Sequence, residues 1–207
     1  MRAGLVRFEL PVDTEQLADR LTHYLGELCK WNKAYNLTAV RNPSEMVPRH
    51  IYDSLSVLPY ITGEYVADVG TGAGLPGIPL ALCCPEKHFT LLDSNGKKTR
   101  FVQHAVNALG LINVSVEQVR VEDYRPTTAF DTVVSRAFAS LHDFVAGCGH
   151  TMATGGRLVA MKGRFPTDEL GALENAQPLW RLSDSGAVDV PEVEGERHIL
   201  VLERQGA

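Results

Sequence analysis

From residue 65 onward, short apolar runs alternate with stretches that carry helix signals, and this alternation constrains the fold more than any other feature of the sequence. The apolar runs cover residues 65–69, 88–92, 114–117, 131–135 and 157–161. Segments 94–109, which Gly110 would end, and 140–151 lie between such runs and can be helical. Strands that alternate with helices pair in parallel through right-handed crossovers. The sequence therefore predicts an α/β fold with a doubly wound, mostly parallel sheet and helices on both faces.

The last part of the chain completes this predicted sheet. A helical stretch over residues 166–176 is followed by two candidates for the sixth strand, residues 179–182 and 188–190, and then by residues 198–202 as the last strand. The short link between the two final strands suggests that they close the sheet as an antiparallel hairpin. The predicted sheet thus has seven strands.

The first part of the chain carries helix signals instead. Leucines recur every three or four residues between positions 14 and 31, which marks an amphipathic helix, and Asp13 is placed as its N-cap. Asn42 followed by Pro43 is typical of a second helix start. We therefore expect a single domain over residues 1–207, in which an N-terminal helical extension, residues 1–60, packs on a core formed by residues 61–207.

Composition and charge exclude several classes of protein. With 44% hydrophobic and 22% charged residues, the chain has the composition of a soluble globular protein. No stretch approaches the roughly 18 uninterrupted apolar residues of a membrane span, and Arg2, Arg7 and Glu9 lie where a signal peptide has its apolar core. We therefore expect a cytoplasmic protein that spans no membrane. A formal net charge of −5 argues against broad binding of nucleic acid, so any such contact must come from a local basic patch.

Neither the cysteines nor the histidines are spaced as metal ligands. Cys29, Cys83, Cys84 and Cys148 contain no Cys-x-x-Cys pair, and the seven histidines contain no His-x-x-x-His pair. We expect reduced cysteines and no metal.

A glycine-rich loop follows the first predicted strand. Residues 68–77 read DVGTGAGLPG, and a ligand is expected against such a loop at the carboxyl end of a parallel sheet. Gly72, Gly74 and Gly77 match the dinucleotide fingerprint, whereas Gly70, Gly72 and Gly74 after Asp68 match the loop that binds S-adenosylmethionine. The charge of Asp68 favours the second interpretation, because a carboxylate attracts the ammonium and sulfonium of the methyl donor and repels a pyrophosphate.

Further donor contacts are expected where the next strands end. Asp93 would accept hydrogen bonds from the ribose hydroxyls, with Ser94 beside it, and Val121 and Glu122 would hold the adenine edge. After the fourth strand, Arg136 could pair with the donor's carboxylate or with an RNA phosphate, because its planar guanidinium suits either partner.

The chain lacks two elements that other nucleic-acid methyltransferases use. It contains neither an Asn/Asp-Pro-Pro-Tyr element, which holds exocyclic amines, nor a Pro-Cys nucleophile for pyrimidine carbons. A ring nitrogen such as guanine N7 already offers a lone pair, so an enzyme that acts there needs alignment more than a general base. Arg136 and Lys162, at the ends of the fourth and fifth predicted strands, are the candidate catalytic residues.

Several segments together resemble one family, the bacterial RsmG (also called GidB) 16S ribosomal RNA guanine-N7 methyltransferases. The matching segments are 30–38 (KWNKAYNLT), 49–51 (RHI) with Asp53 and Ser54, 68–79 (DVGTGAGLPGIP), 91–94 (LLDS), 135–140 (SRAFAS), 162–163 and 195–198 (GERH). The resemblance implies an S-adenosylmethionine-dependent enzyme with the Rossmann-like fold of class I methyltransferases, acting on N7 of a guanine in the 530 loop of 16S RNA. It also implies donor-binding positions at Gly70, Leu75, Asp93, Val121, Glu122 and Arg136.

The RNA contacts are predicted from charge and position, because the resemblance does not assign them. The candidates are Lys33, Asn36, Arg49, His50, Asp53, Lys162 and Arg197. Arg49 and Asp53 are one helical turn apart, able to pair with each other or to face one groove together. Lys97, Lys98 and Arg100 are expected on the solvated face of their helix. The expected partner is 16S rRNA or the small ribosomal subunit, bound by a monomer.

Three other functions stay open from the sequence. A small-molecule methyltransferase would have a deep apolar acceptor pocket in place of an open basic rim. A donor-sensing RNA-binding module would bind both ligands without turnover. A nicotinamide enzyme would use the same glycine loop, although the chain contains no Tyr-x-x-x-Lys pair.

Overall fold

A computed structural model describes residues 1–136 and 138–206, and in it seven strands form one sheet in the order β3-β2-β1-β4-β5-β7-β6. The strands are β1 (Tyr65–Val69), β2 (His88–Leu92), β3 (Val114–Glu117), β4 (Phe130–Ser135), β5 (Met152–Lys162), β6 (Trp180–Ala187) and β7 (His198–Arg204). β1 to β5 pair in parallel, whereas β7 runs antiparallel to both β5 and β6. The predicted doubly wound, mostly parallel seven-stranded sheet with a closing hairpin is confirmed.

Helices connect the parallel strands and precede the sheet. The longer ones are α2 (Thr14–Tyr35), α5 (Gly77–Cys83), α6 (Gly96–Ala108), α7 (Leu141–Cys148) and α8 (Thr167–Ala176). Short helical segments are α1 (Arg2–Leu5), α3 (Pro43–Met46), α4 (Asp53–Leu55), η2 (Leu58–Tyr60), η3 (Val121–Asp123), η4 (Gly149–Thr151) and the π-helical η1 (Val47–Tyr52). The predicted N-caps are present, since the side chains of Asp13 and Asn42 accept hydrogen bonds from the amides of Gln16 and Ser44.

Alternate residues of the strands face two separate apolar cores. Val66 and Val134 pack with the N-terminal helices, α5 and α6, whereas Ala67 and Val133 pack with α7 and α8. Both faces of the sheet are therefore covered, which explains why apolar residues point to both faces of the central strands.

The sixth strand differs from the sequence-based prediction. The strand covers Trp180–Ala187. It overlaps the proposed segment 179–182 and extends five residues beyond it, and it does not include the proposed segment 188–190. Residues 188–190 lie instead in the connection to β7. β6 reads WRLSDSGA, and only one of its residues is buried, because an edge strand has a single neighbour. Its polar pattern gave no apolar alternation to detect.

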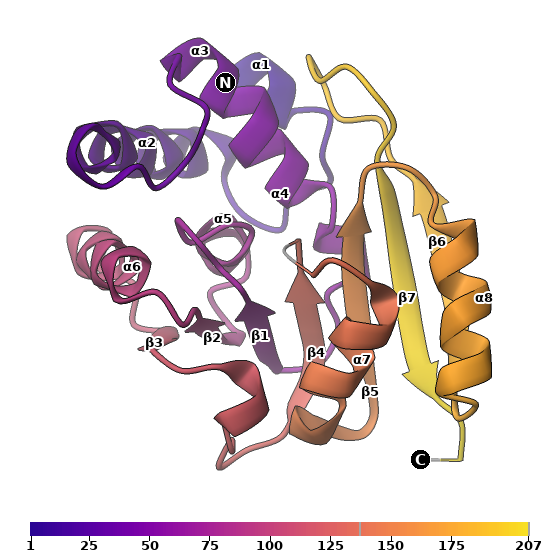
Figure 1. The fold of residues 1–207 in the computed structure, drawn as a ribbon. Helices are drawn as coiled ribbons and strands as arrows, with labels where there is room; N and C mark the ends of the chain where they lie inside the picture. Colours follow the sequence, from indigo (N-terminus) through magenta and orange to yellow (C-terminus); the bar gives the residue numbers. More distant parts are fainter. Residues whose placement is uncertain (137, 207) are drawn as a thin grey trace.

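The N-terminal helices lie at the carboxyl edge of the parallel strands. Figure 1 shows the arrowheads of β1, β4 and β5 pointing toward α1 to α4. The hydroxyl of Tyr24, fully buried in α2, donates a 2.6 Å hydrogen bond to the carbonyl of Ala73 in the glycine loop. Helix α2 also packs on α5 and α6. We propose on this basis that residues 1–60 and 61–207 fold as a single domain.

Within the described residues, no helix is both long and apolar enough to cross a membrane. Nor do three or more His, Cys, Asp or Glu side chains come together there as a metal site.

Candidate functional site

The glycine loop between β1 and α5 is shaped by left-handed backbone at three glycines. Gly70, Gly72 and Gly74 have φ angles of 72°, 61° and 88°. A Cβ on Gly74 would lie 2.5 Å from Ile78, so this glycine allows the loop to pack on α5. A Cβ on Gly72 would meet only a carbonyl oxygen at 3.9 Å. Gly72 therefore leaves open space where a ligand can approach the backbone, whereas Gly74 serves the fold.

Asp68 lies beneath this loop and is fully buried. Its Oδ2 accepts hydrogen bonds from Thr71 Oγ1 at 2.7 Å and from the Gly77 amide at 2.8 Å. Burial raises the pKa of Asp68 to about 6, while these two hydrogen bonds and Arg136 act to lower it. Its Oδ1 is buried and has no hydrogen-bond partner within the described residues. The side chain thus holds the loop from behind, and any attraction for a cationic ligand acts from beneath the loop.

Asp93 connects the glycine loop to the end of β2. Its Oδ2 accepts a hydrogen bond from the Gly72 amide at 3.0 Å, and its Oδ1 accepts one from Asn95 at 2.8 Å. Lys98 lies 3.6 Å from Oδ2, so its ammonium belongs to this site and not to a solvated helix face alone.

Three cavities adjoin along this edge of the sheet. The first, of about 320 Å³ and here named the edge cavity, is lined by Gly70, Asp93, Ser94, Val121 and Glu122, together with Val69, Leu92, Val119, Arg120 and Phe138. The second, of about 160 Å³ and named the loop cavity, is lined by Gly70, Gly72, Leu75, His50 and Arg136, together with Leu37, Thr38, Thr71 and Ala73. Gly70 borders both. Apart from Asp68 and Gly74, which line neither cavity, every predicted donor-binding residue borders one or both of them.

The third and largest cavity, about 520 Å³ and named the arginine cavity, contains most of the predicted RNA contacts. Arg49, His50, Asp53, Lys162 and Arg197 line it, and so does Arg136. His50 and Arg136 border the loop cavity as well, so the two cavities adjoin. The lining combines basic side chains and the carboxylates of Asp53 and Glu194 with apolar ones, so it is not the apolar pocket expected for a small-molecule methyltransferase. Lys33 and Asn36 line none of these three cavities, because both are exposed at the end of α2.

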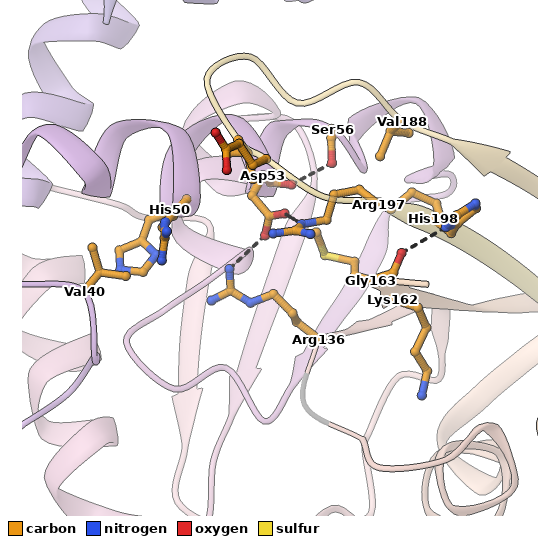
Figure 2. A pocket seen from close by; sticks show the side chains of 15 residues that line it. Val40, His50, Asp53, Ser56, Arg136, Lys162, Gly163, Val188, Arg197 and His198 are labelled. Atoms are coloured by element: carbon orange, nitrogen blue, oxygen red, sulfur yellow. Dashed lines mark hydrogen bonds and ion pairs between the residues drawn. The ribbon is translucent and has the colours of Figure 1, made fainter. Parts of the chain in front are cut away.

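Asp53 joins two arginines from distant parts of the chain. Its Oδ2 accepts a 3.0 Å hydrogen bond from Arg136 Nη1, and its Oδ1 accepts one of 3.2 Å from Arg197 Nε. Figure 2 shows both guanidinium groups directed at this carboxylate. The Asp53 side chain is only 8% exposed, against 33% for Arg136 and 32% for Arg197. Asp53 therefore orients the two arginines and has neither oxygen free for RNA.

Of the two arrangements predicted for Arg49 and Asp53, the direct pair is not formed, whereas both residues line the arginine cavity. Arg49 is exposed, and its Nε lies 3.8 Å from Glu45, one turn earlier. Asp53 begins the segment after the π-helical turn η1 and faces the sheet, where Arg136 and Arg197 reach it. The prediction of a direct pair assumed a regular α-helix between Arg49 and Asp53. The π-helical turn η1 has a different number of residues per turn, so other residues share a face.

His50 lies between the loop cavity and the arginine cavity as a neutral imidazole. It is 6% exposed, and burial lowers its pKa. Its Nε2 lies 2.9 Å from Thr38 Oγ1, which also accepts a hydrogen bond from the Val40 amide. We therefore assign the Thr38 hydroxyl as the donor of a hydrogen bond to His50 Nε2, which leaves the imidazole proton on Nδ1. Nδ1 is buried without a partner in the described part of the chain.

Lys162 forms an ion pair with Glu169 of α8. Its Nζ lies 2.9 Å from Glu169 Oε2 and donates more weakly to the carbonyls of Phe138 and Ala139 at 3.4 and 3.5 Å. The side chain is only 14% exposed and points away from Asp53 in Figure 2. Lys162 therefore ties the connection after β4 to α8, and this placement does not suit contact with a phosphate. Ala137, in the same connection, lies outside the described residues.

Sequence reasoning missed several residues that line the cavities. Thr38 and Leu37 belong to the 30–38 match, which was the only available signal for them. Arg120 and Phe138 border the edge cavity, and Val188, Val193 and Glu194 border the arginine cavity from the connection between β6 and β7. No local pattern marks these residues, because only the packing of the connections brings them to the edge of the sheet.

Comparison with known proteins gives one consistent family. Residues 17–200 match the family model GidB, described as rRNA small subunit methyltransferase G. A protein named ribosomal RNA small subunit methyltransferase G from Marinobacter nauticus is 48% identical over 204 residues, covering 99% of this chain and 94% of its own length. A protein of the same name from Cellvibrio japonicus is 52% identical over 196 residues, covering 92% and 88%.

Solved structures show the same fold at low identity. The ribosomal protein L11 methylase from Lactobacillus delbrueckii subsp. bulgaricus superimposes with a TM-score of 0.58 at 16% identity, over 74% of this chain and 76% of that one. A methyltransferase from Thiobacillus denitrificans in complex with S-adenosyl-L-homocysteine gives 0.54 at 12% identity, over 74% and 90%. Their likeness places the sheet and its crossovers among the Rossmann-like folds of methyltransferases.

Proposed function

This chain belongs to the GidB family of small-subunit rRNA methyltransferases, and from that premise we propose that it transfers the methyl group of S-adenosylmethionine to N7 of a guanine in the 530 loop of 16S rRNA. The observation that carries the proposal is the row of three adjoining cavities. Gly70 is shared by the edge and loop cavities, and Arg136 is shared by the loop and arginine cavities.

The residues around the first two cavities suit S-adenosylmethionine. Gly72 leaves backbone accessible, the buried Asp68 Oδ1 has no partner in the described chain, and Arg136 uses only Nη1 in its hydrogen bond to Asp53. The remaining edge of the guanidinium suits the donor's carboxylate, while Asp68 supports its cationic groups from beneath the loop. Val121 and Glu122 would hold the adenine and Asp93 the ribose, as predicted.

The arginine cavity supports an extruded guanine as acceptor. A base that is methylated within a folded RNA must reach the donor, and a cavity of about 520 Å³ next to the loop cavity offers the space. Arg197 and Arg49 supply positive charge along its wall, and His50 borders it. Lys33 and Asn36 would contact the RNA outside the cavities.

The chain's part in the chemistry is alignment. When bound, the donor supplies an electrophilic methyl group on a sulfonium. Asp53 holds Arg136 and Arg197 in place. Guanine N7 carries no proton and attacks the methyl carbon with its own lone pair as the bond to sulfur breaks, so the chain needs no general base there. Because Lys162 is paired with Glu169, Arg136 remains the stronger candidate for contact with the reacting groups, and Lys162 positions the connection that follows it.

The test is methylation with a labelled donor. Purified protein, 16S rRNA or 30S particles and labelled S-adenosylmethionine should give one labelled guanine at N7, located by nuclease mapping and mass spectrometry. Arg136→Ala should weaken binding of S-adenosylhomocysteine in calorimetry and lower the rate. Label on another base, no label on any RNA, or tight binding of a pyridine nucleotide in place of S-adenosylhomocysteine would contradict the proposal.

We also propose that the protein works as a monomer in the bacterial cytoplasm, where ribosomal subunits are assembled. Light scattering during turnover tests the oligomeric state.

A further inference from the structure

The surface where the end of α2 lies beside α6 is rich in cations, and the acid between the two helices, Glu27, is already paired with Lys30 and His104. Residues 28–44 and 94–116 contain no Asp or Glu, although the whole chain has 25 acidic residues and a net charge of −5. These stretches include the last two turns of α2, residues 28–35, and all of α6, and the two helices lie next to each other in Figure 1. The acidic character of the protein is thus interrupted at one place on its surface.

The two helices pack in opposite directions. Arg20, early in α2, donates a hydrogen bond to the carbonyl of Leu109 at the end of α6, whereas the Trp31 ring lies 5.7 Å from that of Phe101. The last turn of α2 therefore lies beside the first turns of α6. Exposed cations occupy both ends, with Lys33 on α2 and with Lys97 and Arg100 on α6.

These cations have no acidic partners. Within the described residues, neither Lys33, Arg41, Lys97 nor Arg100 lies within 4.0 Å of a carboxylate, because none of them is among the ion pairs that the structure contains. By contrast, the neighbouring Lys30 is paired with Glu27 at 2.6 Å. Unpaired cations on an acidic protein leave a local positive potential that suits phosphates.

An aromatic pair lies in the middle of this surface. The rings of Trp31 and Tyr35 are 5.3 Å apart, and Trp31 also lies 4.9 Å from the ring of His104. Tyr35 is 40% exposed and is one of the few large hydrophobic residues that the protein shows to solvent. Exposed rings beside cations are typical of surfaces on which unpaired bases stack.

The surface is continuous with the site. The loop after α2 brings Leu37 and Thr38 to the loop cavity, and α6 begins three residues after Asp93 of the edge cavity. We propose that Lys33, Tyr35, Arg41, Lys97 and Arg100, together the α2–α6 surface, bind a single-stranded RNA segment that flanks the methylated base. This rests on the proposed function and extends its RNA contacts outside the three cavities from the end of α2 to α6.

The first experiment removes charge. Lys97→Ala/Arg100→Ala is compared with Arg181→Ala/Arg204→Ala, which removes two cations at the opposite end of the sheet. Binding of 16S rRNA is measured between 50 and 200 mM salt, roughly the range over which phosphate contacts dominate. The α6 variant should bind more weakly, with a slope of log affinity against log salt that is smaller by about 2. The control variant should keep the wild-type slope, and both should bind S-adenosylhomocysteine like the wild type.

The second experiment removes the ring. Tyr35→Ala should weaken binding of 16S rRNA by about tenfold or more, because stacking of one base is lost. Tyr35→Phe, which keeps the ring, should bind 16S rRNA with the affinity of the wild type. In methylation assays the α6 variant and Tyr35→Ala should each have a higher KM for 16S rRNA than the wild type and an unchanged kcat. A short RNA that ends close to the methylated base should be used equally well by the variants and the wild type.

Two outcomes would overturn the proposal. The α6 variant and Tyr35→Ala could match the control on 16S rRNA, or they could lose affinity only for 30S particles, which would indicate a protein partner on this surface. If the wild type itself methylates no RNA, the proposed function fails; if it methylates RNA and the variants match the control, only this inference fails.

Discussion

Asp53 shows how a single buried carboxylate can organise a site whose other members lie far away in the sequence. It accepts hydrogen bonds from Arg136 and Arg197, which are 83 and 144 residues away along the chain. A carboxylate that is 8% exposed is stable here because two cations compensate its burial. It had been predicted to contact RNA, but its environment assigns it to positioning.

Asp53→Asn should lower kcat/KM for RNA methylation by about 100-fold, since the two guanidinium groups lose their common acceptor charge and small misplacements are costly. The stability should change by only about 1–2 kcal/mol, because both arginines keep access to water. Steady-state kinetics and urea unfolding measure the two effects. Glu203→Gln, which breaks the Arg157–Glu203 pair, is the matched control and should leave kcat/KM unchanged. Equal losses in the two variants would contradict a positioning role for Asp53.

Asp68 gives a pH-dependent prediction. Burial raises its pKa in the folded chain from 3.8 to about 6, so between these values the folded chain retains a proton that the unfolded chain has lost. The stability contributed by this group is therefore present below pH 4 and falls as the pH rises to 6. Relative to Asp68→Asn, the free energy of unfolding of the wild type should decrease by at most about 3 kcal/mol across that window. Urea titrations at several pH values measure the difference, and parallel curves for the two proteins would contradict it.

At the scale of elements, the connections after the strands decide which side chains meet. The connection after β4 brings Arg136 to Asp53, and it is tied down by Lys162, which binds the carbonyls of Phe138 and Ala139 and the carboxylate of Glu169. Glu169 in turn accepts a hydrogen bond from the amide of Leu141 at the start of α7. The end of β5 and two helices thus hold one connection in place.

Lys162→Met keeps most of the unbranched apolar stem of the side chain and removes its charge. We expect the free energy of unfolding to fall by about 1–3 kcal/mol, because Glu169 is left without its cation. Affinity for S-adenosylhomocysteine should fall as well, since Phe138 borders the edge cavity. The dependence of RNA binding on salt should stay at the wild-type slope, as measured by filter binding. A smaller slope would show that Lys162 contacts a phosphate after all.

At the scale of the whole molecule, the N-terminal helices complete both the apolar core and the site. Leu21, Tyr24 and Leu28 of α2 are fully or almost fully buried against the same core as α5 and α6. Because this cluster crosses the boundary between residues 1–60 and 61–207, we expect the chain to unfold as a single unit.

The two tryptophans allow a direct test of this unit, because Trp31 lies in α2 and Trp180 in β6. Variants Trp31→Phe and Trp180→Phe each leave one fluorescent reporter. In Trp31→Phe, the urea transition measured by Trp180 fluorescence should coincide with the transition measured by circular dichroism. In Trp180→Phe, the transition measured by Trp31 fluorescence should do the same. Earlier unfolding at Trp31 would mean that the N-terminal segment is a separate unit.

The sequence alone determined the strand–helix alternation, the glycine loop, the N-caps and the candidate donor-binding residues at the strand ends, because neighbouring residues encode each of them. The sequence predicted the position of the sixth strand only approximately, because the polar edge strand β6 has no alternation of apolar and polar residues. Only the tertiary structure decided that Asp68 lies beneath the loop, that Asp53 binds Arg136 and Arg197, and that Lys162 faces Glu169. Partners of charged side chains depend on which elements pack together, and long-range packing leaves no local pattern in the chain.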